Sequence, residues 1–308
     1  MTSPAATLQD RVQAALDAFL ARTAPLVCDI SPDAQPLVAS LTRMLAGGKR
    51  LRPSFAYWGY RATGGSDSDS LVTACSALEL LQACALIHDD VMDDSDTRRG
   101  NPSVHRQFET LHRDNAWYGS SELFGTGAAI LIGDLALSWA DQMLIGSGLP
   151  SHELDCAKAT YDVMRTELMA GQYLDLVEQN RRQTTVDRAL TVIRYKSAKY
   201  SIEQPLLMGA RMSGCSSDTD EALSTFGLAI GEAFQLRDDL LGVFGTAEMT
   251  GKPSGDDLRE RKQTVLLAVG MSRDSGRLHS LLAQPHSTHE DISEMREILF
   301  TCGAAQQV

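Results

Sequence analysis

Signals that would place a chain in a membrane or outside the cell are missing from this sequence. No basic-then-apolar stretch typical of a signal peptide opens the 308 residues. No apolar run reaches the roughly 18 residues that a membrane span requires. The six cysteines form no C-x-x-C pair, and several lie in apolar stretches, where a free, buried thiol is expected. We therefore expect a cytoplasmic protein.

Basic charge, strand patterns and nucleophilic motifs are also missing. The net charge of −12 argues against a nucleic-acid partner. We find neither the alternating pattern of half-buried strands nor a short repeat, and no Ser-His-Asp or Cys-His arrangement. The chain is 43% hydrophobic and 22% charged, which is ordinary for a globular protein with a large core. We predict an all-α fold with a single domain over residues 1–308.

The most informative stretch is Leu78–Gly100, which begins as an apolar run of helical spacing and ends in a group of aspartates. Asp89 and Asp93 are four residues apart and share one face of a helix. Two like charges at that spacing destabilise a helix by about 0.2–0.5 kcal/mol, so this helix end requires a cation. Carboxylate oxygens that leave room for water and substrate phosphates suit Mg²⁺.

An isolated acidic cluster is more often a solvated helix end, and that alternative applies to Leu78–Gly100 taken alone. A second cluster weakens it. Phe234–Gly242 also ends an apolar helical run, here with Asp238 and Asp239. Two such helices facing one another across a cavity would hold a magnesium cluster, and that cluster would bind a diphosphate.

Six motifs occur in an order that resembles one protein family. They are GGKRLRP, DDVMD followed by RRG, GQYLDL, YKSAKYS, FQLRDDLLG and GKPSGDD. Together they resemble the trans-isoprenyl diphosphate synthases, or polyprenyl synthetases, from about Pro36 to Leu267. The resemblance implies antiparallel helices bundled around a central cavity, Mg²⁺ as cofactor, isopentenyl and allylic diphosphates as substrates, and a homodimer. We expect in particular a bacterial geranylgeranyl diphosphate synthase.

The resemblance also implies roles for individual residues. The ligands of Mg²⁺ would be Asp89, Asp93 and Asp238. The residues for isopentenyl diphosphate would be Lys49, Arg52 and Arg99, with Gln82 beside them. The residues that serve the allylic diphosphate in catalysis would be Arg98, Lys196 and Lys252, with Gln172, Ser197 and Gln235 nearby.

Two positions depart from the family's pattern. Gln82 stands where many members have a histidine that contacts isopentenyl diphosphate. Glutamine keeps a hydrogen-bond donor but cannot carry an imidazolium charge, and a buried, hydrogen-bonded glutamine is the alternative. Gly242 stands where the second cluster of other family members has a further aspartate. Because the expected ligand is Asp238, we expect the metal ligand to be kept and one neighbouring carboxylate to be lost.

Local patterns predict the course of the chain. Helical spacing and helix-start signals predict helices at Leu8–Leu20, Leu37–Leu45, Ala128–Gly146, from Ser151 to about Val177, and from Thr184–Asp187. The stretch Trp117–Gly127 is rich in glycine and serine and is predicted to be a mobile connector. Pro205 is predicted to mark a kink or a break.

The implied reaction is head-to-tail prenyl transfer. Magnesium and the cationic side chains would stabilise the departing diphosphate, and the double bond of isopentenyl diphosphate would attack the allylic cation. A class I terpene cyclase is one alternative, but its second metal motif has an Asn/Asp–Ser–Glu pattern. A non-catalytic synthase subunit would be expected to lack a metal or phosphate residue. The third alternative is a helical bundle that binds a small molecule without converting it. An assay with radiolabelled isopentenyl diphosphate distinguishes this alternative from an active synthase.

Product length depends on the helix that precedes Asp89. One helical turn rises about 5.4 Å, which is on the order of one isoprene unit. Ala85 and, on its flank, Cys84 lie one turn before Asp89, and neither is the bulky aromatic that fifteen-carbon synthases tend to place there. Leu81 and Leu78, about 12 and 16 Å from Asp89, are the next candidates for the floor of the pocket. This favours geranylgeranyl diphosphate; farnesyl diphosphate and longer products are the alternatives.

Overall fold

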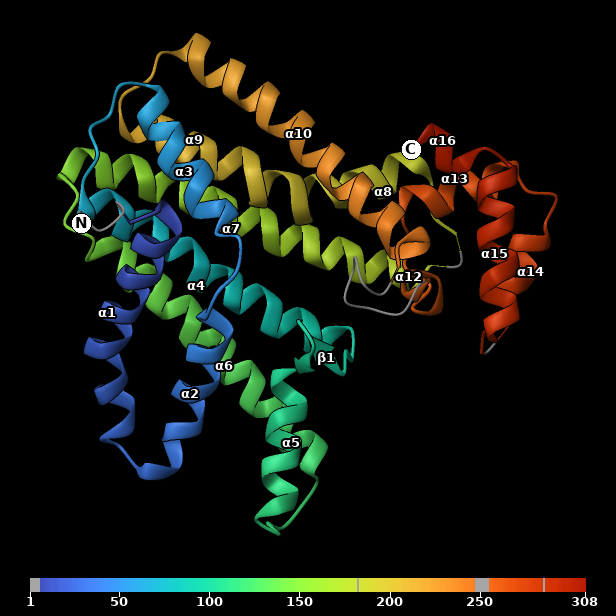
Figure 1. The fold of residues 1–308 in the computed structure, drawn as a ribbon, viewed down its shortest axis with the longest axis horizontal. Coiled ribbons are helices and arrows are strands. Elements are labelled where there is room, and N and C mark those ends of the chain that lie inside the picture. The colour runs from blue at the N-terminus through green and yellow to red at the C-terminus, as the bar shows by residue number, and fades with distance from the viewer. Residues whose placement is uncertain (1–5, 182, 247–254, 285) are drawn as a thin grey trace, which may run out of the picture. The chain divides into compact units, whose positions relative to one another are not determined.

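The structure is a computed structural model that describes residues 6–181, 183–246, 255–284 and 286–308 (Figure 1). These residues are almost entirely helical, with one pair of two-residue strands, so the all-α prediction is confirmed. The chain divides into two compact units, which are described separately. Unit 1 comprises Met1–Tyr161 and Pro205–Asp220, and unit 2 comprises Asp162–Gln204 and Glu221–Val308. The single domain stays a prediction.

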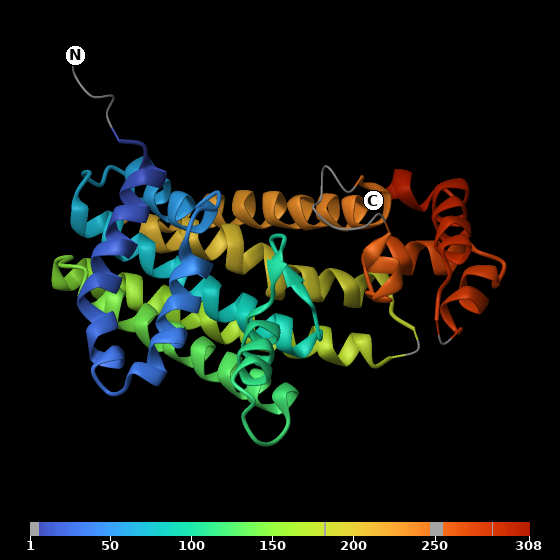
Figure 2. The same cartoon turned by 60° about the horizontal axis from the view of Figure 1, so that its bottom comes forward.

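Unit 1 is built around α4 (Asp69–Met92), which contacts five other helices of the unit. These and the remaining helices of unit 1 are α1 (Leu8–Cys28), η1 (Pro32–Ala34), α2 (Gln35–Leu45), α3 (Leu51–Ala62), α5 (Val104–Asp114), α6 (Ser121–Ile145), the start of α7 (Ser151–Gln179) and most of α9 (Gln204–Met212). The two long helices α4 and α6 run side by side in both views (Figure 1, Figure 2). Because α4 is apolar on nearly every face, most of its residues are buried, and its exposed residues lie at its two ends.

The predicted connector Trp117–Gly127 is wrong over its second half, because α6 already begins at Ser121. The side-chain oxygen of Ser120 accepts a hydrogen bond from the backbone N–H of Leu123 and caps the helix. Gly125 serves packing, since a Cβ there would lie 2.3 Å from the carbonyl oxygen of His105 on α5. The glycines and serines that suggested a loop are therefore a cap and a close helix–helix contact.

A short hairpin follows the acidic end of α4, where no strand was expected. Its strands are β1 (Thr97–Arg98) and β2 (Asn101–Pro102), which pair antiparallel. The two residues between them, Arg99 and Gly100, have φ angles of 54° and 75°. Positive φ at both central residues is the geometry of a type I′ turn, which matches the twist of a hairpin.

Unit 2 contains the remainder of α7 and α10 (Ser217–Phe244), with a C-terminal group of short helices. The other helices of unit 2 are α8 (Val186–Val192), η2 (Ile193–Glu203), α12 (Asp256–Arg259), α13 (Val265–Arg273), α14 (Arg277–Leu282), α15 (His289–Thr301) and α16 (Ala304–Gln307). Its core includes Val243 at the end of α10, Leu258 on α12 and Leu266 on α13.

The segment η2 is a π-helix of 11 residues, a conformation that is rare and often marks functional sites. Three glycines let neighbouring helices approach it closely. A Cβ at Gly171 on α7 would lie 2.5 Å from the backbone nitrogen of Lys196, and Gly227 and Gly231 on α10 meet η2 in the same way. The π-helix ends at Glu203, so the predicted irregularity at Pro205 corresponds to a change from π- to α-helix.

Two helices are long and apolar enough to cross a membrane, contrary to the expectation from the sequence. They are α4 and α6, judged by length and composition alone. The apolar window of α4 is 67% buried inside the structure, and that of α6 is 44% buried. Because α4 is enclosed by other helices of unit 1, it is a core helix; the face that α6 leaves exposed is considered below.

The close contact between α10 and η2 leads to a prediction about stability. A Cβ at Gly231 would lie 2.7 Å from the Cα of Ala198, so Gly231→Ala should lower the free energy of unfolding by about 1–3 kcal/mol. Gly127 on α6 has no atom within 4 Å of its added Cβ. Gly127→Ala should therefore stabilise by up to about 1 kcal/mol. Urea unfolding followed by circular dichroism measures both, and equal midpoints would contradict the packing described.

Candidate functional site

The first acidic cluster lies where α4 ends, and its members differ in exposure. Asp89 is half-buried, Asp90 is buried, and Asp93 is exposed as the C-cap residue. Oδ1 of Asp90 accepts a hydrogen bond of 2.9 Å from Nε of Arg98, and Nη2 of Arg98 lies 3.6 Å from Oδ2 of Asp89. Burial raises the pKa of Asp90, an effect that Arg98 opposes. Asp90 therefore fixes the guanidinium of Arg98 beside the predicted metal ligand Asp89.

The hairpin turn sends its two arginines to different places. While Arg98 points back to the acidic end of α4, Arg99 reaches the loop that precedes α3. Its Nη atoms lie 3.8 and 3.9 Å from the position of a Cβ at Gly48. Lys49 is exposed on this loop, and Arg52 is half-buried in the first turn of α3. The structure thus brings Arg99 to the loop that carries Lys49, while Arg98 contacts Asp90 and Asp89. Gln82 is half-buried on α4.

A residue that sequence reasoning missed holds this basic loop in place. Arg50 is buried and adopts a left-handed conformation with φ of 52°. Its Nη1 donates to Oε2 of Glu79 on α4 at 2.5 Å, and its Nη2 donates to the carbonyl oxygen of Leu45 and to Gln13 on α1. The signal was Glu79 itself, because a carboxylate inside an apolar helix requires a cationic partner.

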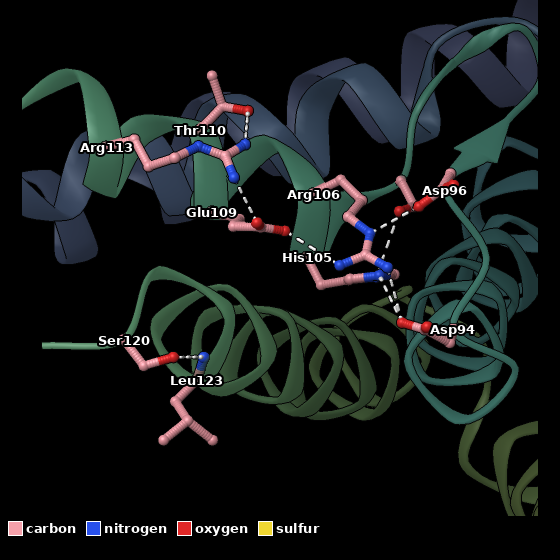
Figure 3. A network of polar contacts seen from close by, with 10 residues as sticks. Asp94, Asp96, His105, Arg106, Glu109, Thr110, Arg113, Ser120 and Leu123 are labelled. Atoms are coloured by element: carbon pink, nitrogen blue, oxygen red, sulfur yellow. Dashed lines mark hydrogen bonds and ion pairs between the residues drawn. The ribbon is translucent and has the colours of Figure 1, made fainter.

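The last two aspartates of the first cluster, Asp94 and Asp96, form ion pairs with an arginine side chain of α5. Figure 3 shows Arg106 between Asp94 and Asp96, with Nη2–Oδ1 and Nε–Oδ1 distances of 2.8 Å each. Arg106 also donates to Glu109 at 3.0 Å, and Nε2 of His105 lies 3.9 Å from Asp94. This network ties the start of the hairpin to α5. It assigns Asp94 and Asp96 to loop structure, and the metal prediction rests on Asp89 and Asp93.

The second acidic cluster lies in unit 2, which also holds an ion pair between a predicted substrate residue and a buried carboxylate. Nζ of Lys196 on η2 donates to Oδ2 of the buried Asp175 on α7 at 2.6 Å. On α10, Nε2 of Gln235 donates to Oδ1 of the buried Asp239 at 2.9 Å, and Asp238 is exposed. The structure therefore confirms neither a ligand nor a contact for Asp238, which stays a predicted metal ligand on an accessible surface.

The neighbouring predicted residues have more ordinary surroundings. Gln172 on α7 and Ser197 on η2 are half-buried, and both stay predictions. Lys199, three residues after Lys196, pairs with Glu167 at 2.8 Å and lies 3.6 Å from Glu203, so its ammonium group lies between two carboxylates. Lys252 lies outside the described residues.

A second missed residue, Lys262, lies among the carboxylates of unit 2. Burial would lower the pKa of its ammonium group, but Asp257, Asp239 and Asp175 raise it above its ordinary value. Conversely, burial raises the pKa of Asp239 to about 6, with Asp257 and Asp238 adding to the rise and Lys262 opposing it. Lys262 follows Asp257 by five residues in a charged stretch, and no local pattern distinguishes it from a solvated lysine.

The acidic residues fit Mg²⁺, although they form no complete cage by themselves. Within the part of the chain that the structure describes, no group of three or more His, Cys, Asp or Glu side chains is arranged to hold a metal. Oδ2 of Asp90 is buried without a hydrogen-bond partner, so the end of α4 retains acceptor capacity. Magnesium binds through one or two carboxylates and completes its shell with water and substrate phosphates. Asp89 and Asp93 in unit 1 and Asp238 in unit 2 therefore stay predicted ligands of this kind.

The predicted product-length residues lie on α4 before Asp89. Ala85 is half-buried, whereas Cys84, Leu81 and Leu78 are 5%, 1% and 0% exposed. Burial raises the pKa of the Cys84 thiol to about 12, so this cysteine is an apolar wall residue rather than a nucleophile. Their lining of a product tunnel stays a prediction.

Comparison with known proteins agrees with the motifs and the fold. The sequence model described as polyprenyl synthetase matches residues 34–299. The short chain isoprenyl diphosphate synthase of Methanothermobacter thermautotrophicus is 34% identical over 284 residues, which cover 91% of this chain and 81% of that protein. The geranylfarnesyl diphosphate synthase of Natronomonas pharaonis is 34% identical over 247 residues, 75% of this chain and 67% of its own length.

A solved structure extends this similarity to the fold. The geranylgeranyl pyrophosphate synthase from Corynebacterium glutamicum, complexed with isoprenyl diphosphate and magnesium, superposes with a TM-score of 0.92 at 41% sequence identity. The match covers 98% of this chain and 89% of that structure. Because these relatives are named for prenyl products of different length, the comparisons leave the chain length of this protein's product open.

The Asp90–Arg98 pair leads to a prediction about the first cluster. Asp90→Asn removes the charge that holds a largely buried guanidinium, so the free energy of unfolding without metal should fall by about 1–3 kcal/mol. Asp67→Asn is the matched control, because Asp67 pairs with Arg11 at a more exposed position. That control should cost less than about 1 kcal/mol. Urea unfolding compares the two, and equal losses would show that Asp90 is no more than a surface partner.

Proposed function

The chain belongs to the polyprenyl synthetase family, and we propose that it condenses isopentenyl diphosphate head-to-tail with an allylic diphosphate to give a short-chain prenyl diphosphate. The observation that carries this proposal is the divergence of Arg98 and Arg99. Adjacent guanidiniums reach different surroundings in unit 1, one at the acidic end of α4 and one at the basic loop before α3. Two separate cationic sites are what a reaction between two diphosphates requires.

The chain's own residues would contribute by binding and orienting the substrates. Arg98 and Lys196 would bind the leaving diphosphate, and the planar fork of an arginine suits two phosphate oxygens at once. Magnesium bound by Asp89, Asp93 and Asp238 would supply Lewis-acid stabilisation of that diphosphate. The apolar residues of α4 before Asp89 would exclude water from the allylic cation.

The bond changes in the proposed reaction balance without a nucleophile on the protein. The C–O bond of the allylic diphosphate breaks, and its electron pair leaves with the diphosphate. The double bond of isopentenyl diphosphate then forms the new C–C bond, and the proton that is lost goes to the departing diphosphate. The sequence carries cationic residues for two diphosphates, which favours this reaction over a class I cyclase with a single diphosphate and over a non-catalytic subunit.

We further propose a homodimer that forms through α6, in the cytoplasm. Apolar side chains of α6 are exposed in unit 1, among them Leu123, Ile130 and Leu131. Residues seven and eight apart share a helix face, so these three form one apolar strip. Exposed apolar strips of this kind mark interfaces more often than free surface, and a second copy of the chain would cover the strip with its own.

Loss of a predicted metal ligand should abolish turnover while the fold survives. Asp89→Ala or Asp238→Ala should lower turnover by at least about a hundredfold, because charge on the leaving diphosphate loses its stabilisation. Prenyl transfer from radiolabelled isopentenyl diphosphate measures the effect, and circular dichroism checks the fold. Asp67→Ala, at an exposed ion pair, is the control. Near wild-type turnover of Asp89→Ala with Mg²⁺ present would refute the assignment.

The two cationic sites should separate in steady-state kinetics. Arg52→Ala should raise the Michaelis constant for isopentenyl diphosphate much more than that for the allylic substrate, because the loop before α3 serves the first substrate only. Arg43→Ala, on the exposed end of α2, is the matched control and should change neither constant. An equal rise for both substrates, with an unchanged circular dichroism spectrum, would contradict the division.

Product length should respond to side-chain size on α4. We propose geranylgeranyl diphosphate as the product, with farnesyl diphosphate and longer chains as alternatives. Ala85→Phe should shorten the product, because the ring would fill the space one turn before Asp89, and Leu81→Ala should lengthen it. Chromatography of the dephosphorylated products gives the distribution, and an unchanged distribution in Ala85→Phe would show that this face lines no tunnel.

The Leu81 variant needs a stability control. Leu81 is 1% exposed, so its truncation to alanine should cost about 2–5 kcal/mol of unfolding free energy. The product assay is therefore run well below the unfolding midpoint of each variant. Leu80→Ala, an equally buried residue about 100° further around the helix, should cost similar stability without changing product length.

A further inference from the structure

The two acidic clusters of this chain have unequal numbers of aspartates. The first reads Asp-Asp-Val-Met-Asp and the second reads Asp-Asp-Leu-Leu-Gly. Residues i and i+4 share a helix face, so Asp93 lies over Asp89 on α4, whereas Asp238 on α10 has only Gly242 at the corresponding position. The second cluster therefore lacks one carboxylate on its own helix.

The space beside Gly242 is filled by a carboxylate from another part of unit 2. A Cβ built on Gly242 would lie 2.0 Å from Oδ2, 2.5 Å from Cγ and 3.0 Å from Oδ1 of Asp257. No side chain can occupy that position while Asp257 remains where it is. Glycine is the residue that permits such a close approach to a helix backbone.

The position of Asp257 is fixed by its neighbours in the chain. It lies on the short helix α12, where the next residue, Leu258, is 2% exposed and packs in the same core cluster as Val243 of α10. The backbone N–H of Lys262 donates to the carbonyl oxygen of Asp257 at 2.9 Å. Core packing on one side and a backbone hydrogen bond on the other hold the carboxylate against α10.

The surroundings of Asp257 are those of a member of the acidic cluster rather than of a surface residue. Its charge is the largest of those that raise the pKa of Lys262, and it contributes to the raised pKa of Asp239. Asp257, Asp239, Asp175 and Asp238 all raise the pKa of the Lys262 ammonium group, so these four carboxylates surround one lysine of unit 2.

We propose that Asp257 supplies the missing carboxylate of the second cluster, through the space that Gly242 leaves open, and acts as a positioning residue for Mg²⁺ and the allylic diphosphate. The carboxylate that α10 lacks at Gly242 is thus supplied by Asp257 on α12. The inference rests on the proposed function, because it gives Asp257 a part in binding the diphosphate of that reaction.

A reciprocal exchange tests the proposal. The probe is inorganic pyrophosphate, titrated calorimetrically into the full-length protein with Mg²⁺, and the metal-free unfolding temperature is measured for every variant. Asp257→Gly and the isosteric Asp257→Asn should each weaken Mg²⁺-dependent pyrophosphate binding about 10- to 100-fold, the usual effect of losing a group next to a metal ligand. Gly242→Asp alone should lower the metal-free unfolding temperature by a few degrees, since its side chain would overlap Asp257.

The double variant Gly242→Asp/Asp257→Gly returns the carboxylate to α10 and empties the space on α12. It should regain the unfolding temperature and most of the pyrophosphate affinity, a non-additivity that a structural role alone would not give. Ala222→Asp, at an exposed position of α10, is the control for introducing an aspartate into this helix and should change neither measurement.

The outcomes separate the inference from the function on which it rests. If the wild-type protein binds pyrophosphate and Asp257→Asn binds it with the same affinity, the role of Asp257 is refuted but the proposed function is not. The same holds if the losses of affinity in the two single variants simply add in the double variant. A wild-type protein that neither binds pyrophosphate with Mg²⁺ nor transfers prenyl groups would overturn the proposed function and this inference together.

Discussion

The structure depends on the balance of charge around carboxylates that are held close together. In unit 1, Asp90 is balanced by Arg98, and Asp94 and Asp96 by Arg106. Without these cations, the repulsion among five acidic residues at one helix end would be added to the cost of burying Asp90.

In unit 2 the balancing cations are lysines rather than arginines. Lys196 pairs with Asp175, and Lys262 is surrounded by acidic side chains. An ammonium group is a compact point charge on a flexible stem, whereas a guanidinium has a fixed planar fork. Arg98 therefore presents a rigid fork to Asp90, whereas Lys196 presents a point charge to Asp175. The backbone of the π-helix that carries Lys196 lies close to three glycines of neighbouring helices.

The sequence was sufficient to predict features that depend on residues close together in the chain. Helical spacing located α4 and the beginning of α7, and the i, i+4 rule placed Asp89 and Asp93 on one face. The elements that were missed depend on contacts between distant residues. Gly125 resembled a loop residue until its packing against His105 was known, and Gly242 resembled a simple loss until the carboxylate of Asp257 was found beside it. Composition cannot distinguish a glycine in a flexible loop from a glycine that allows another part of the chain to pack closely against a helix.

The short hairpin after α4 has a consequence for insertions and deletions. Side chains alternate along a strand, and the type I′ turn fixes which residue occupies each central position. One residue deleted between Asp93 and Arg98 would place Arg99, rather than Arg98, against Asp90, and one added residue would place Thr97 there. A change in the length of this segment would therefore separate Arg98 from Asp90, whereas a substitution at an exposed position would leave that pair in place.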